Sequence, residues 1–355
     1  MAILMTKKRF LIYLILSTLL IVFAILFTAR LDDFSLEKTQ TVDIKFKVNN
    51  NLLSGTLILP PSGRPNAITL FMHGDGPQDR YSNGGYMPLI NTLVANNIGV
   101  FSWDKAGIGE SEGNWLTQSM NERATEAQVA LNLLREKYPT TQIGYFGFSQ
   151  AGWVIPIAAS NSSPDFSVII GGAVNWRDQG AFYHRTRLNR TGLSPKAINQ
   201  LVDEQLQSND HTFGINGNHD PATSPEMSTD RFNFVVKNYL NDASKDIPQM
   251  NGRILAIWGE DDLNVDARTD ACRYKKLLAK KPDSTVILIK NSTHGLLNAS
   301  WFNYQLESQW PWWKKAYFLY LGRDGYNPEA LNFLINWLND QQTSIPTDWQ
   351  PHCNK

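Results

Sequence analysis

The sequence predicts an α/β protein in which a mostly parallel sheet of eight strands carries helices on both faces. Short apolar runs of strand length recur along the chain and alternate with longer segments of helical spacing, which is the order typical of parallel sheets. In addition, the apolar run 143–148 leads directly into a serine between small residues, which indicates a sharp turn from a strand into a helix.

The strands are expected at regular intervals. Residues 42–48 and 53–60 flank an asparagine-rich turn and predict a leading antiparallel hairpin. The remaining strands, expected to form a mostly parallel sheet, lie around Leu70, Phe101, Tyr145, Ile169, Ala256 and Leu288.

Helices are predicted between these strands. Residues 86–97 and 331–338 have helical spacing, and the second of these would brace the loop after the last strand. The clearest apolar stripe, at steps of four and three, consists of Met120, Ala124, Ala127, Leu131 and Leu134.

Ser149 is the candidate nucleophile. A serine at the tip of a strand-to-helix turn needs small residues two places before and after it, because Cβ atoms would collide there. Gly147 and Ala151 meet this need, although glycine is usual at the second place. The alternative is a serine that only caps a helix.

An acid and a histidine follow the serine in the chain. A buried strand at 254–259 ends in an acidic turn that contains Asp262, and a later strand at 285–289 precedes His294. Serine, aspartate and histidine in this order, with the histidine as base and the acid orienting it, predict a catalytic triad.

Neighbouring residues compete for two of these roles. Asp261 and Asp266 are alternatives for the acid, but Asp262 has the Gly-x-x-Asp spacing from Gly259. Among the six histidines, His294 alone follows a strand after the acid.

A glycine-rich loop is expected to stabilise developing negative charge. The strand around Leu70 leads into His73, Gly74 and Asp75, and this loop would supply one N–H of an oxyanion hole. The N–H of Gln150 would be the first donor. A further loop, residues 103–113, has the pattern Asp-x-x-Gly-x-Gly-x-Ser-x-Gly, and Asp104 is given a structural role there.

Together these motifs, between about residues 41 and 345, resemble an α/β-hydrolase, close to the serine peptidase (S9/S33-like), esterase and acyl-thioesterase branches. The resemblance implies a serine hydrolase that cleaves an ester, thioester or amide bond of a small-molecule or peptide substrate through an acyl-enzyme. It also implies that the segment between the strands near Val174 and Ile254 is a lid. The helix opened by Ser194 and Pro195 would place Ile198, Leu201 and Val202 over the site.

Composition excludes several other functions. Lysine plus arginine and aspartate plus glutamate number 33 each, so no long-range field favours nucleic acid. The sequence has no motif for a metal, a nucleotide or another cofactor, and a triad needs none. The 42% hydrophobic content suits a large core, and the 11 tryptophans suggest an aromatic-lined cleft, although none is assigned to substrate.

The N-terminus predicts membrane attachment. Lys7, Lys8 and Arg9 precede an apolar run at 10–27 that is long enough for a transmembrane helix. The charge bias keeps the N-terminus cytoplasmic and the catalytic domain outside, in a bacterial periplasm or at the cell exterior. A cleaved signal peptide is the competing interpretation, but residues 27–29 lack a typical cleavage site.

The cysteines leave one question open. Cys272 and Cys353 would pair in an oxidising compartment, which the sequence does not decide. The sequence has four glycosylation sequons, and a glycan at Asn291 or Asn298 would crowd the active-site entrance beside His294. Glycosylation is therefore not expected at these two sites, which favours a bacterial cell envelope over a eukaryotic secretory route.

The predicted organisation is a signal anchor at 1–30, a linker at 31–40, core at 41–174, lid at 175–250, core at 251–345 and a tail at 346–355. Two alternatives to an esterase remain. One is an aminopeptidase-like enzyme, in which the lid acids Asp203 or Glu204 would hold a substrate ammonium. The other is a catalytically silent hydrolase-fold protein that only binds.

Overall fold

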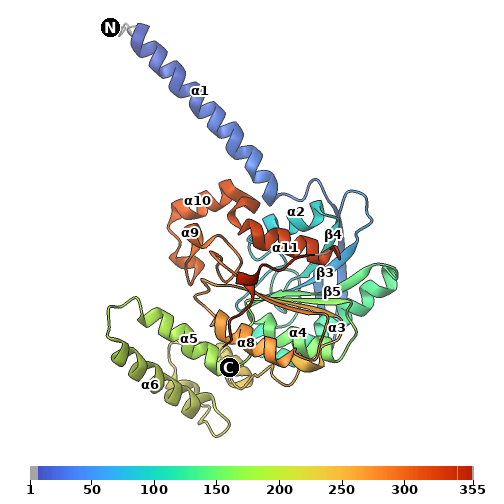
Figure 1. Cartoon of the computed structure of the whole chain (residues 1–355), viewed down its shortest axis with the longest axis vertical. Coiled ribbons are helices and arrows are strands. Elements are labelled where there is room, and N and C mark those ends of the chain that lie inside the picture. The colour runs from blue at the N-terminus through green and yellow to red at the C-terminus, as the bar shows by residue number, and fades with distance from the viewer. Residues whose placement is uncertain (1–6, 342, 354–355) are drawn as a thin grey trace.

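The computed structural model describes residues 7–341 and 343–353 and contains one eight-stranded sheet (Figure 1). The strand order is β1-β2-β4-β3-β5-β6-β7-β8. The pairs β1–β2 and β2–β4 are antiparallel and all other neighbours are parallel. The strands are β1 Gln40–Val48, β2 Asn51–Leu59, β3 Ala67–Met72, β4 Ile98–Trp103, β5 Gln142–Phe148, β6 Phe166–Ile170, β7 Arg253–Gly259 and β8 Ser284–Ile289.

This topology confirms the predicted fold class, including the leading hairpin. The central strands β3 and β4 are buried along their whole length, because helices cover both faces of a parallel sheet and each strand is almost wholly apolar. In Figure 1, α2 and α11 lie over one face, and α3, α4 and α8 over the other. Those helices are α2 Met87–Ala95, α3 Met120–Lys137, α4 Ala151–Ser160, α8 Ala267–Leu277 and α11 Pro328–Leu338.

The segment between β6 and β7 forms a separate helical layer. It contains α5 Trp176–Leu188, α6 Pro195–Phe213 and α7 Thr229–Asn238. In Figure 1, α5 and α6 form a pair that extends away from the sheet. The pair is cross-linked by Arg177 of α5, which makes two hydrogen bonds to Asp210 of α6, at 2.7 and 2.6 Å.

Two further helices follow β8, at a place where the sequence predicts only the terminal helix. They are α9 Ala299–Phe302 and α10 Trp312–Leu321. Aromatic rings hold them together: Phe302 stacks on Trp310 with ring centroids 5.0 Å apart and meets Phe318 edge-on at 5.7 Å. These helices build a wall beside the end of the sheet.

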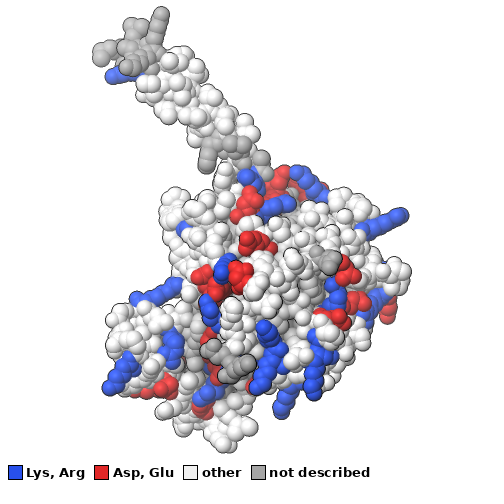
Figure 2. All heavy atoms as spheres, viewed as in Figure 1, with Lys and Arg blue, Asp and Glu red and all other residues white. Residues whose placement is uncertain are grey.

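The N-terminal helix α1, Lys7–Arg30, projects from the body (Figure 1). In Figure 2 it is mostly free of charged side chains, whereas both signs of charge are interspersed over the body. Within the described part of the chain, no helix is both long and apolar enough to cross a membrane, so the predicted transmembrane helix is not supported.

The chain just after α1 is tied to the wall formed by α10. Asp33, in the 3-10 turn Leu31–Phe34, receives hydrogen bonds from the main chain of Arg323, at 2.7 Å, and from its guanidinium. Phe34 meets Phe318 edge-on at 5.8 Å. At the other end of the chain, Cys272 of α8 and Cys353 form a disulfide.

Candidate active site

Ser149 lies at the turn between β5 and α4 and has a φ of +54°, a conformation that is strained for a residue with a side chain. The turn is held by the Ser149 N–H, which donates to the Ile170 carbonyl at 2.8 Å. A Cβ at Gly147 would lie 2.5 Å from the Cβ of Ala151. The steric reason for small residues at both positions is therefore present, and Ala151 fits because Gly147 has no side chain.

Asp262 and His294 form a hydrogen-bonded pair across the ends of β7 and β8. His294 Nδ1 lies 2.6 Å from Asp262 Oδ2, and the aspartate side chain is fully buried. The other carboxylate oxygen accepts main-chain N–H groups from Asn264, at 2.7 Å, and from Val265, at 2.9 Å. Because an ionised carboxylate only accepts, Nδ1 carries the proton and Nε2 is left free to act as a base.

Gly171 provides the space beneath the imidazole. It follows β6 with a φ of +60°, and a Cβ there would lie 2.8 Å from His294 Nδ1 and 2.9 Å from its Cε1. Any side chain at this position would displace the imidazole ring, so the site requires glycine here.

Ser149 and His294 line the same cavity, of about 550 Å³, between the sheet and the helical layer formed by α5, α6 and α7, which is the segment predicted to be a lid and is called the lid below. The lid contributes Trp176 and Tyr183 from α5 and Arg231 from α7 to its walls. Trp176 stacks on Trp153 of α4 with centroids 4.8 Å apart, which joins the lid to the helix that carries the serine.

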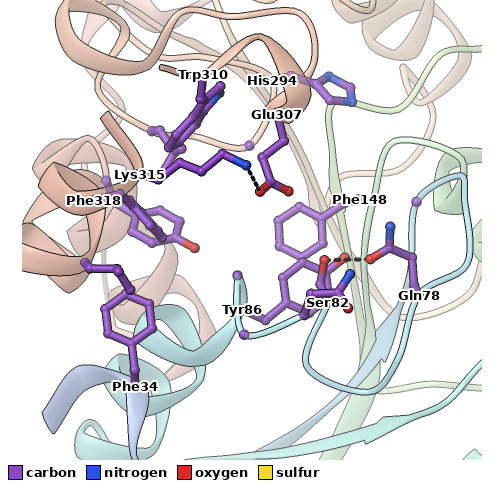
Figure 3. Close-up of a pocket in the computed structure, with 18 residues that line it drawn as sticks. Phe34, Gln78, Ser82, Tyr86, Phe148, His294, Glu307, Trp310, Lys315 and Phe318 are labelled. Atoms are coloured by element: carbon purple, nitrogen blue, oxygen red, sulfur yellow. Dashed lines mark hydrogen bonds and ion pairs between the residues drawn. The ribbon is translucent and has the colours of Figure 1, made fainter. Parts of the chain in front are cut away.

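A second cavity, of about 420 Å³ (Figure 3), shares His294 and Gly74 with the first, because both residues line both cavities. Its walls are mostly apolar, and the charged pair Glu307–Lys315, 3.3 Å apart, lies at its side. Figure 3 shows Phe34 and Phe318 facing Tyr86 and Phe148 across this space. The aromatic lining comes from Phe34, Tyr86, Phe148, Trp310, Phe318 and Tyr326.

The predicted oxyanion loop, Gly74 and Asp75, lies beside the serine. A Cβ on Gly74 would be 3.3 Å from the Ser149 Cβ, so the loop backbone approaches the serine closely. Gln150 is the N-cap of α4, and an N–H at the start of a helix has no acceptor within that helix. The two predicted donors therefore flank the serine.

Asp75 connects this loop with the lid and the serine turn. It accepts two hydrogen bonds from Arg231, at 2.9 and 2.7 Å, and one from the Gln150 side chain at 3.1 Å. Burial alone would raise the pKa of Asp75, but the hydrogen bonds and charge of Arg231, with help from Lys105, outweigh it and lower this pKa.

Two buried cations lie behind the loop. Lys105 Nζ donates to the carbonyls of Gly74, at 2.6 Å, and Gly76, at 2.9 Å. Arg123 of α3 donates to the His73 carbonyl at 2.7 Å and to the Gln150 side-chain oxygen at 2.5 Å. All of these side chains are almost completely inaccessible to solvent.

His73 itself is neutral. Its Nε2 lies 2.6 Å from the Trp103 carbonyl and donates to it, and its ring stacks on Tyr86. Burial is the main cause that lowers the pKa of His73 to about 3. His73 therefore fixes the start of the loop and does not compete with His294.

The alternative acids have other positions. Asp266 caps α8 by accepting the N–H of Thr269 at 3.1 Å, and Asp261 is exposed. Asp104 holds Arg80 through its carboxylate, with the closest contact at 2.6 Å, in agreement with the predicted structural role. The lid acids Asp203 and Glu204 are exposed on α6 and line neither cavity.

Comparison with protein families matches residues 63–300 to a family described as serine aminopeptidase, S33. The chain belongs to this S33 family. It is thus a serine hydrolase of the α/β-hydrolase superfamily, as its motifs predict.

This S33 hydrolase is also similar to human monoglyceride lipase, with 22% identity over 247 residues, covering 66% of this chain and 78% of the lipase. Among solved structures, the Pyrococcus furiosus esterase Pf2001 matches with a TM-score of 0.51 and 17% identity, covering 81% of this chain and 92% of the esterase. Est1E from Butyrivibrio proteoclasticus, solved with ferulic acid, matches with a TM-score of 0.51 and 13% identity, covering 84% of this chain and 96% of Est1E. At these identities the two structures show the fold alone.

Sequence reasoning did not identify three residues of the S33 site: Lys105, Arg123 and Arg231. Lys105 follows the aspartate of the 103–113 loop, and its place in that motif was the only available signal. Arg123 and Arg231 reach the site from helices far away in the sequence, so no local pattern marks them.

Proposed function

We propose that the protein is a carboxylester hydrolase in which Ser149, Asp262 and His294 form the catalytic triad. The observation that carries this proposal is the meeting of the strained Ser149 and the hydrogen-bonded Asp262–His294 pair in one cavity, with the Gly74–Asp75 loop as its wall.

In the first half of the reaction, His294 Nε2 takes the Ser149 Oγ proton while Oγ bonds to the ester carbonyl carbon. The carbonyl oxygen becomes an oxyanion that the N–H groups of Gln150 and Asp75 stabilise. Collapse of this intermediate breaks the bond to the leaving alkoxide, which takes the proton from His294.

In the second half, water loses a proton to His294 and attacks the acyl-enzyme. The carboxylic acid leaves, and the proton returns to Ser149 Oγ. Asp262 keeps its charge throughout and stabilises the imidazolium.

We propose further that the substrate carries an aliphatic acyl chain. The smaller cavity is mostly apolar and adjoins His294 and Gly74, so a chain attached to the reacting carbonyl would bury apolar surface there. The larger cavity, with Arg231, Gln179 and Gln305 in its walls, suits a polar leaving group.

The first test is hydrolysis of p-nitrophenyl acetate, butyrate and octanoate, combined with fluorophosphonate labelling. We expect stoichiometric labelling of Ser149, and both labelling and turnover should be abolished by Ser149→Ala and His294→Ala. A folded protein that neither labels nor hydrolyses any of the three esters would contradict the proposal and favour a catalytically silent binding protein.

The second test locates the acyl chain. Leu319 of α10 lines the smaller cavity and is 39% exposed, so Leu319→Trp would narrow this cavity without disturbing the core. We expect kcat/KM to fall on octanoate and to stay unchanged on acetate. Leu193→Trp, at an exposed lid position outside both cavities, is the matched control. An equal effect of Leu319→Trp on both esters would contradict this assignment.

An aminopeptidase-like function is the alternative. The acids in the two cavity walls, Asp75 and Glu307, are already paired with Arg231 and Lys315, and this favours esters over a substrate ammonium. Hydrolysis of leucine p-nitroanilide at a rate comparable with that of p-nitrophenyl butyrate would favour the aminopeptidase-like function over the esterase function.

We also propose that the protein acts outside the cytoplasm, attached to a membrane through α1. The Cys272–Cys353 disulfide supports an oxidising compartment, and exposed apolar residues along α1, such as Phe10 and Leu20, support contact with lipid. Cell fractionation, with protease treatment of intact spheroplasts, tests this. Recovery of the protein in the soluble cytoplasmic fraction would contradict it.

A further inference from the structure

The oxyanion loop has a feature that the triad does not require: its carbonyls are held from behind by buried cations. Lys105 Nζ donates to the Gly74 carbonyl at 2.6 Å, and Arg123 donates to the His73 carbonyl at 2.7 Å. Each bond fixes one peptide group of the loop. No cis peptide occurs in the part of the chain that the structure describes.

The orientation of these carbonyls sets the orientation of the donors. In a trans peptide, the C=O of one residue and the N–H of the next point in opposite directions. With the Gly74 carbonyl turned back toward Lys105, the Asp75 N–H points away from Lys105. With the His73 carbonyl turned toward Arg123, the Gly74 N–H points away from Arg123 and faces the hydroxyl of Tyr86. Gly74 and Asp75 form the wall of the cavity that contains Ser149.

We infer that Lys105 and Arg123 are positioning residues for the oxyanion hole. Lys105 turns the N–H of Asp75 toward the substrate by holding the Gly74 carbonyl behind it, and Arg123 fixes the preceding peptide of the loop through the His73 carbonyl. This inference rests on the proposed esterase function. Arg123 also bonds the Gln150 side chain, and that side chain donates to Asp75, so the two sides of the oxyanion hole are joined by one network.

The cost of burial supports a functional role. Lys105 is only 3% exposed, and no carboxylate among the described residues lies within ion-pair distance of its Nζ. Burial of a cation costs desolvation free energy, and an apolar residue could fill the same space without that cost. Burial, with the nearby charge of Arg123, lowers the pKa of Lys105 well below its usual range.

The test uses Lys105→Met, which keeps an unbranched side chain only one heavy atom shorter and removes the donor. A trifluoromethyl ketone with a butyl chain serves as probe: Ser149 Oγ adds to its carbonyl carbon, His294 takes the proton, and the oxygen becomes an oxyanion. We expect kcat on p-nitrophenyl butyrate to fall on the order of 10²-fold with little change in KM, the loss typical of one oxyanion donor. The inhibition constant of the ketone should rise by the same factor.

This comparison separates positioning from stability. A variant that is merely less stable has fewer folded molecules, but those molecules keep the wild-type inhibition constant. Arg80→Met is the matched control, because Arg80 is also a buried cation but bonds to Asp104, Thr56 and Ser54. We expect it to lower the melting temperature and to leave the inhibition constant unchanged.

If Lys105→Met does not fold, Arg123→Lys takes its place. It keeps a cation but is too short to reach both the His73 carbonyl and the Gln150 side chain. The inference is overturned if the folded variant binds the ketone as tightly as the wild type does. Absence of ketone binding and of ester hydrolysis in the wild type would instead contradict the esterase function itself.

Discussion

At the residue scale, the position of His294 depends on a glycine that has no chemical role of its own. Gly171 has a positive φ and lies directly against the imidazole. Its substitution therefore tests how accurately the base must be placed, because reacting groups displaced by about 1 Å can lose on the order of 10²-fold in rate.

We predict that Gly171→Ala lowers kcat on p-nitrophenyl butyrate by about 10²-fold or more, since the new Cβ displaces the imidazole of His294 from its present position. Gly192→Ala is the matched control: Gly192 also has a positive φ, of +76°, but a Cβ there would meet nothing within 4 Å. Both variants should lose stability of about 1 kcal/mol from backbone strain. Equal kcat values for the two would contradict this role of Gly171.

The same scale shows what sequence alone can predict. The positions of Ser149, Asp262 and His294 after the ends of β5, β7 and β8 were predictable because local motifs record the spacing from each strand, and the structure brings Asp262 and His294 into contact. The positions of Lys105 and Arg123 could not be predicted in this way, because both side chains bind main-chain carbonyls. Every residue has such a carbonyl, so the sequence does not indicate which carbonyls are bound.

At the element scale, Arg231 attaches α7 of the lid to the oxyanion loop. Arg231 reaches Asp75 with two hydrogen bonds and also lies over the rings of Trp115 and Phe234. The lid position and the shape of the oxyanion loop are thereby coupled.

We predict that Arg231→Gln and Asp75→Asn are not additive in kcat/KM. The pair is partly exposed, so the coupling energy should be modest, about 0.2–1 kcal/mol, and should shrink in 0.5 M salt. The measurement is a double-mutant cycle on p-nitrophenyl butyrate at low and high salt. Strict additivity at low salt would show that the ion pair does not couple the lid to the loop.

A second element-scale prediction concerns α8. Burial raises the pKa of Asp270 to about 7, against the opposing effects of the Val174 N–H and Arg273. Asp266 and Asp178 add to the rise. A raised folded-state pKa favours folding below the unfolded value of 3.8, and this contribution is lost as the pH rises through 7.

The free energy of unfolding of the wild type relative to Asp270→Asn should therefore fall between about pH 4 and pH 7 and level off above that range. Urea unfolding of both proteins at pH 4.5, 6 and 8 measures this difference. A difference that increases with pH would mean that Asp270 is ionised in the folded protein at all three values.

Elements also differed in how well the sequence predicted them. Strands β3 to β7 were recognisable because each is a largely apolar run that sheet packing buries, and the edge strand β8 was recognisable from its buried second half. Helix α10 was missed because its aromatic residues, which pack on α9 and line the smaller cavity, have no simple helical stripe.

At the scale of the whole molecule, the disulfide closes a loop with a sequence separation of 81 residues between α8 and the tail. We predict that Cys353→Ser lowers the free energy of unfolding by about 2–4 kcal/mol, mainly because the unfolded chain regains freedom. Urea unfolding of wild type and variant, each with and without reductant, measures this, and the reductant should affect only the wild type. Two free thiols in the native purified protein would contradict the pairing.

The attachment of the chain at Asp33 and Phe34 has a practical consequence for anyone who trims this protein. Phe34 is one wall of the smaller cavity, and Asp33 anchors it to Arg323. A truncated version that begins at β1 would keep the whole sheet with Ser149, Asp262 and His294, yet its smaller cavity would open to solvent on one side. The preference of this truncated protein for esters of different acyl-chain length would then reflect the opened cavity and not the cavity of the intact protein. A shortened version should therefore keep Leu31 and the residues after it.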